Sequence, residues 1–139
     1  MNGPESPAGA YVQSLLGWTH LIYALHAFSI VTGILGPATV VTMFLTGWPS
    51  IIAVILNYVK RRDARGTWLE SHFRWQLRTF WYGVLWVGLC LLFGFLFVLV
   101  TIGIGALIAW IPLMLVGVWF VYRIVRGWTA LSNRQMMYV

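Results

Sequence analysis

Two long stretches of the sequence carry no charged residue, and this feature constrains the fold more than any other. Residues 6–59 lie between Glu5 and Lys60, and residues 79–122 lie between Arg78 and Arg123. A helix that crosses a membrane needs about 20 predominantly apolar residues. Each stretch is long enough for two such helices and leaves no comfortable room for a third. We therefore expect an all-α integral membrane protein with four transmembrane helices.

The composition supports this class and excludes several others. Hydrophobic residues make up 60% of the chain and charged residues 9%, whereas a soluble domain averages about 45–50% and about 25%. A soluble enzyme or a disordered segment is therefore excluded. The single cysteine, Cys90, excludes an intramolecular disulfide and a cysteine-built metal site. We expect one membrane domain that covers residues 1–139.

Helix-breaking residues divide the two stretches. Gly36-Pro37 separates the first span (14–35) from the second (37–59), and a glycine-containing turn at 101–105 separates the third (80–100) from the fourth (106–125). Pro49 and Pro112 lie inside predicted spans. Each proline is either a packing kink or a broken helix of the kind that forms substrate sites in transporters.

The distribution of basic residues predicts the orientation. With four spans, both termini and the middle loop share one side of the membrane. All nine Lys and Arg residues fall on that side, and none falls in the two turns on the other side. The positive-inside rule places this side in the cytoplasm. We expect a multi-pass protein of the bacterial inner membrane with both termini cytoplasmic.

Several of these cations stand at helix ends, where they favour the helix dipole and reach the headgroup layer. We expect membrane lipids as partners, with anionic headgroups on the cytoplasmic side. The alternative is that these side chains only anchor and orient the helices. The candidate headgroup contacts are Lys60, Arg61, Arg62, Arg65, Arg123 and Arg126.

Residues 67–79 predict an amphipathic interfacial helix on the cytoplasmic surface. Thr67 and Glu70 have the spacing of a capping box. Glu70, Arg74 and Arg78 recur every four residues and form one charged face. Such a helix is either an interfacial anchor or a docking surface or lateral gate. The candidate surface comprises Trp68, Glu70, His72, Arg74, Trp75 and Arg78, with His72 as a headgroup or capping contact or as a pH-sensitive group.

Polar and small residues recur on one face of the first span, and this face is expected to point into the helix bundle. They are Thr19, Tyr23, His26, Ser29 and Gly33. His20 and His26 are too far apart in sequence to share one metal ion. No other span contains His, so a haem would have to be shared across a symmetric oligomer. We expect no cofactor.

The sequence contains little that could carry catalysis. No Asp or Glu lies within a predicted span, and no catalytic triad, phosphate-binding loop or metal-ligand cluster is visible. Nucleic acid is not expected as a partner, because the basic residues lie beside an anionic membrane surface. The sequence therefore predicts a protein that is not an enzyme.

Several short motifs resemble one known family, over nearly the whole chain. They are Thr19-His20-Leu21, Gly36-Pro37, Asn57-Tyr58-Val59-Lys60-Arg61, the loop residues Trp68, Glu70, His72 and Leu77, Arg126-Gly127-Trp128 and Arg134-Gln135-Met136-Met137-Tyr138. The chain resembles small four-span bacterial membrane proteins of unknown function that are grouped with the chloroplast Tic import-channel subunit. The resemblance implies the same four-helix topology, an inner-membrane location and a link to protein translocation. It implies no catalytic residue.

Two functions follow as expectations. The first is an accessory or scaffold protein that forms a homo-oligomer or joins a larger membrane complex. The second is a channel or protein-translocation component, which the Tic-like resemblance and the proline in the second span suggest.

Overall fold

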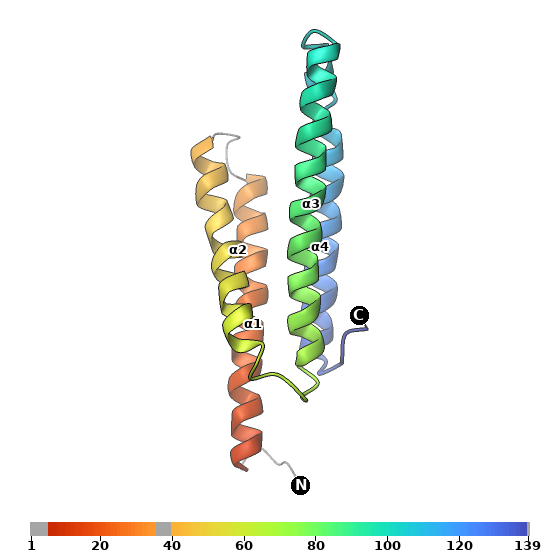
Figure 1. Cartoon of the computed structure of the whole chain (residues 1–139). Coiled ribbons are helices and arrows are strands. Elements are labelled where there is room, and N and C mark those ends of the chain that lie inside the picture. The colour runs from red at the N-terminus through yellow and green to blue at the C-terminus, as the bar shows by residue number, and fades with distance from the viewer. Residues whose placement is uncertain (1–5, 36–39, 139) are drawn as a thin grey trace.

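The computed structural model describes residues 6–35 and 40–138, with side chains for 6–32 and 47–138. Figure 1 shows how its elements follow one another along the chain. They are α1 (Pro7–Leu35), α2 (Val40–Lys60), α3 (Glu70–Val100), the short 3-10 helix η1 (Ile104–Leu107) and α4 (Ile111–Ser132). No strand occurs among the described residues, and the all-helical class is confirmed.

Three helical segments are long and apolar enough to cross a membrane. They are Pro7–Thr32, Glu70–Val100 and Ile104–Ser132, with mean hydropathies of 1.3, 2.7 and 2.3 in their most apolar windows. These segments support the expected membrane protein. Part of α2 lies outside the described side chains, and its crossing of a membrane stays a prediction. The predicted turn at Gly36-Pro37 also lies outside the described residues.

The helices form two hairpins, α1 with α2 and α3 with α4, which lie side by side (Figure 1). The start of α1 and the segment that follows α4 lie toward the end where α2 leads into α3, and we call this end the base (Figure 1). At the opposite end, the α3–α4 pair reaches well beyond the α1–α2 pair (Figure 1). We call residues 86–119 the distal hairpin.

The buried side chains gather at the base, where the two hairpins meet. Close approach of the helices there depends on Gly127 in α4, since a Cβ at this position would lie 2.5 Å from the hydroxyl of Tyr23 in α1. In contrast, Gly105 is the one buried residue of the distal hairpin. The largest fully buried side chains are Tyr23, Phe73, Leu15, Ile22, Leu69 and Leu131.

The predicted interfacial helix at 67–79 is not a separate element. Residues 67–69 form turns, Leu69 precedes the helix, and α3 continues without interruption from Glu70 to Val100. No Gly or Pro lies between Glu70 and Tyr82 to stop the helix. These first turns of α3 also bury side chains on several faces, against the other helices, instead of lying flat with one apolar face. The buried residues there are His72, Phe73, Trp75, Gln76, Leu77, Thr79 and Gly83.

The two prolines differ in where they stand along their helices. Pro112 is not a kink within a span beginning at 106, because α4 begins at Ile111 and Pro112 stands in its first turn. Proline is favoured there, since the amide hydrogens of the first turn have no helical acceptor. Pro49 does lie inside a helix, and α2 is assigned as one helix from Val40 to Lys60. The helix is therefore not broken at Pro49.

The polar face predicted for α1 is buried in part. Thr19, Tyr23 and His26 are each at most 1% exposed, and Ser29 is half-buried. The hydroxyl of Thr19 donates to the carbonyl of Leu15, one turn earlier, at 2.7 Å. Gly33 lies outside the residues whose side chains are described. The described part of this face therefore points toward the other helices at the base.

Candidate functional site: a polar interior and a basic rim at the base

His72 lies at the centre of a hydrogen-bonded cluster that joins three parts of the chain. Its Nε2 lies 2.7 Å from the carbonyl oxygen of Gln135, and its Nδ1 lies 3.2 Å from the hydroxyl of Tyr23. A carbonyl can only accept, so Nε2 donates and the Nδ1 of a neutral imidazole accepts from Tyr23. His72 is fully buried and its ring also meets Trp68 edge to face. The first turn of α3 is thereby held to α1 and to the C-terminal segment.

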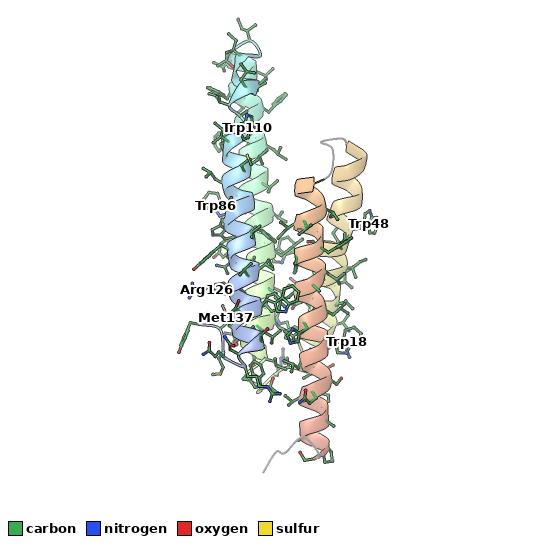
Figure 2. All side chains as sticks on the ribbon, turned by 180° about the vertical axis from the view of Figure 1, so that it is seen from behind. Trp18, Trp48, Trp86, Trp110, Arg126 and Met137 are labelled. Atoms are coloured by element: carbon green, nitrogen blue, oxygen red, sulfur yellow. The ribbon has the colours of Figure 1, made fainter. Side chains whose placement is uncertain are left out.

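The C-terminal segment is fixed a second time beside this cluster. The backbone N–H of Met137 donates to the hydroxyl of Ser71 at 3.0 Å, and the Met137 side chain is 7% exposed. Figure 2 shows Met137 and Arg126 near the base, away from the distal hairpin. The tail is therefore packed against the start of α3, a contact that was not predicted from the sequence.

A second group of buried amides links α2 to α3 and α1. The side-chain N–H₂ of Asn57 donates to the side-chain oxygen of Gln76 at 2.8 Å and to the backbone carbonyl of Phe73 at 3.2 Å. Gln76 in turn donates to the backbone carbonyl of Thr19 at 3.4 Å. Asn57 and Gln76 are each 1% exposed. In a poorly hydrated setting such bonds between helices favour one fixed arrangement of the two hairpins.

The predicted headgroup residue Arg123 instead faces α3. Its guanidinium lies 3.7 Å from the centre of the Trp75 ring, and its Nε donates to the hydroxyl of Thr79 at 2.8 Å. The indole N–H of Trp75 donates to the backbone carbonyl of Arg123 at 3.2 Å. Cation–π stacking and these two hydrogen bonds together join α3 to α4. Arg123 is half-buried, and Trp75 is 7% exposed.

The remaining histidines also serve contacts between helices. One nitrogen of His26 lies 3.1 Å from the hydroxyl of Ser50 in α2, and its ring packs near Phe80 and Phe120. His20 accepts a hydrogen bond from the indole N–H of Trp128 at 3.1 Å. No group of three metal-ligating side chains occurs among the described residues. Each of the three histidines therefore has hydrogen-bond partners of its own.

The residues predicted as one docking surface fall into two sets. Glu70, Arg74 and Arg78 follow one edge of α3, and the Glu70 carboxylate pairs with Arg74 at 3.2 Å and accepts from the backbone N–H of Gly66 at 3.1 Å. His72 and Trp75 point inward, and Trp68 is half-buried. Charged residues at every fourth position therefore mark only one exposed edge of this helix, and its other faces are buried.

The other basic residues predicted as headgroup contacts form a rim around the base. Lys60 pairs with Asp63 at 3.4 Å and lies over the ring of Trp18. Arg126 donates to the hydroxyl of Tyr122 at 3.0 Å. Three more guanidinium groups are exposed in the segment that follows α2, on Arg61, Arg62 and Arg65. The rim therefore presents several cations at the surface of one end of the molecule.

We found no protein family, no curated protein and no solved structure that matches this chain. The likeness to Tic-like proteins therefore stays a prediction from the sequence motifs.

Proposed function

We propose that this chain is a non-enzymatic accessory or scaffold protein of the bacterial inner membrane, with four spans and both termini in the cytoplasm. It acts through contacts between helices and at the membrane surface. The observation that carries this proposal is the unequal reach of the two hairpins. The distal hairpin extends beyond α1 and α2, and many of its apolar side chains are exposed among the described residues.

The uncovered surface of the distal hairpin is large and almost wholly apolar. Phe93, Phe95 and Leu115 are 63%, 62% and 66% exposed. A shallow apolar groove of about 650 Å³ also runs along α3 and the start of α4, beside the small residues Gly94 and Ala109. Small residues allow another helix to approach closely in a membrane. In a membrane, such a surface is covered either by lipid tails or by the helices of a partner protein. In a scaffold protein, partner helices cover it.

The base supports the orientation in this proposal. All nine basic residues lie in α2's last turn, the loop, the early turns of α3, the end of α4 or the tail, whereas the segment from Thr101 to Trp110 has none. The polar interior supports a fixed structure for this end, because its side chains are engaged with one another. The exposed Arg74 and Arg78 thus stand on a rigid helix, which suits contact with a partner or with headgroups.

The test is crosslinking in native membranes followed by purification and mass measurement. We expect a defined species larger than the monomer. Replacing Gly88 by Leu fills open space on the distal hairpin, because a Cβ there meets, among the described residues, no atom within 4 Å apart from its two neighbours and the backbone of its own helix turn. It should weaken the crosslinked species without unfolding the protein. The matched control is Gly47→Leu in α2, where a Cβ also meets no atom within 4 Å. A protein that is strictly monomeric and without partner would contradict the proposal.

A channel or translocation component is the second candidate. Pro49 removes one backbone donor from the interior of α2, and the adjacent Ser50 lies within hydrogen-bond distance of His26 in α1. A polar pair beside a proline inside a helix is the feature that favours this second function. Reconstitution in liposomes tests this function. The absence of flux for ions, small solutes and peptides would remove it, and His26→Phe should abolish any flux that is found.

A further inference from the structure

A groove of about 490 Å³ opens at the base between the end of α2 and the first turns of α3. We infer that this groove binds one anionic phospholipid, with the lipid phosphate at its basic end and an acyl chain along its apolar end. The residues that carry the argument are Tyr58 and Arg61 from the α2 side and Arg74, Arg78, Trp81 and Leu85 from α3. The inference goes beyond the accessory function and requires only that the base lies at a membrane surface.

The charge of the groove is unbalanced. Arg61, Arg74 and Arg78 contribute three positive charges and Glu70 one negative charge, which leaves two positive charges (3 − 1 = 2). Glu70 is already engaged by Arg74 at 3.2 Å. Among the described residues, the guanidinium groups of Arg61 and Arg78 make no hydrogen bond and no ion pair. Two guanidinium groups are therefore free to bind phosphate oxygens, for which their planar fork is well suited.

The groove changes from charged to apolar along α3. Arg74 and Arg78 are followed on the neighbouring edge of the helix by Leu77, Trp81 and Leu85. Arg78 and Leu85 are seven residues apart, which corresponds to about 10 Å of helix rise. A free phosphate would use only the basic end, and an acidic peptide would leave the apolar end exposed. A phospholipid matches both ends in this order.

Aromatic side chains form the middle of the groove. The indole N–H of Trp81 donates to the hydroxyl of Tyr58 at 3.2 Å, which bridges α3 to α2. The two side chains are 54% and 48% exposed, so they border the groove without filling it. Trp and Tyr are enriched where headgroups meet acyl chains. Their place between the cations and Leu85 therefore indicates the level of the membrane interface.

A second copy of the chain is a poorer occupant. The protein carries three acidic residues against nine basic ones. Of these acids, Asp63 and Glu70 already pair with cations of their own chain. A second copy would therefore bring mainly positive charge to a positive groove, which favours a lipid phosphate as the occupant.

The test is native mass spectrometry of the full-length protein in detergent, titrated with phosphatidylglycerol or with phosphatidylcholine of the same acyl chains. The unmodified protein should bind the first phosphatidylglycerol at least about tenfold more tightly than phosphatidylcholine. The double variant Arg61→Gln, Arg78→Gln should lose this preference. The control Arg62→Gln, Arg65→Gln removes the same charge from exposed positions that do not border this groove, and should keep most of it. Circular dichroism verifies that both variants keep their helix content.

Three results would overturn the inference. The first is an equal loss of preference in both double variants, which would mean general attraction to a basic surface. The second is no preference of the unmodified protein for phosphatidylglycerol. The third is displacement of the lipid by an excess of inorganic phosphate, which would identify the groove as a site for a free anion. None of these results depends on the crosslinked complex, so the accessory function is tested separately.

Discussion

The base and the distal hairpin are built from the same helices and yet are stabilised in different ways. At the base, side chains from all four helices are buried, and polar groups are paired across helices, as with His72 and Tyr23 or Asn57 and Gln76. In the distal hairpin, which reaches beyond α1 and α2, the outward side chains are apolar and exposed. In this chain, burial follows the number of neighbouring helices and does not follow hydrophobicity. The least polar part of the molecule is therefore also the least buried.

The sharpest comparison uses two phenylalanines on the same helix. Phe73 at the base is 1% exposed and Phe93 in the distal hairpin is 63% exposed. Phe73→Ala should lower the free energy of unfolding by about 3 kcal/mol or more, because it leaves a cavity in the buried cluster at the base. Phe93→Ala should change it by less than about 0.5 kcal/mol. Unfolding in mixed micelles by titration with sodium dodecyl sulfate measures both. Equal costs would mean that the two regions do not differ in packing.

A pair of glycines in α4 gives the next largest difference. A Cβ at Gly127 would lie 2.5 Å from the Tyr23 hydroxyl and 2.8 Å from a ring carbon, whereas a Cβ at Gly117 would meet no atom within 4 Å. Tyr23 cannot move easily, because it is buried and bonded to His72. We expect Gly127→Ala to cost about 1–3 kcal/mol from overpacking. Gly117→Ala should be neutral or slightly stabilising. The same micelle titration measures both, and a neutral Gly127→Ala would show that α1 and α4 are not in close contact.

A smaller and more local effect is expected at His72. His72→Phe removes the bonds to Tyr23 and to the Gln135 carbonyl, and we expect a cost of about 1–3 kcal/mol. Backbone hydrogen exchange of the C-terminal segment should rise, including at Met137, because one of its two attachments to α3 is lost. Arg74→Gln is the control on the same helix, since Arg74 is exposed and does not bond the tail. Unchanged exchange at the tail would mean that Ser71 alone holds it.

The sequence predicted well where helices form, but it did not predict which side chains contact one another between the helices. Charge-free stretches and helix breakers predicted the last residues of α1 and α3, Leu35 and Val100, and both ends of α2 to within three residues. In contrast, α1 begins seven residues and α3 ten residues earlier than predicted. The start of α4 was placed too early, because η1 and the turn before Ile111 are as apolar as the helix. The charged edge formed by Glu70, Arg74 and Arg78 was identified from its spacing and is exposed or half-buried in the structure.

The early turns of α3 were misinterpreted for a physical reason. His72 and Gln76 are polar and lie among charged residues, so their pattern is typical of a surface helix. Their burial depends on partners far away in sequence, such as Tyr23 and Asn57, and helical periodicity carries no information on such pairs. The packing of Met137 was also missed, although the apolar Met136 and Met137 in the tail were a weak signal for it.

The most direct test of the account is the side of the membrane on which each end of the molecule lies. Single cysteines at Arg65 near the base and at Ile104 in the tip of the distal hairpin, both exposed, are introduced into a Cys90→Ser protein. Neither position is one of the glycines, Gly66 and Gly103, whose positive φ angles would strain a cysteine. A membrane-impermeant thiol reagent added to intact cells should label Ile104→Cys and should label Arg65→Cys only after the membrane is opened. Labelling of Arg65→Cys in intact cells, or protection of Ile104→Cys from the outside, would contradict the account.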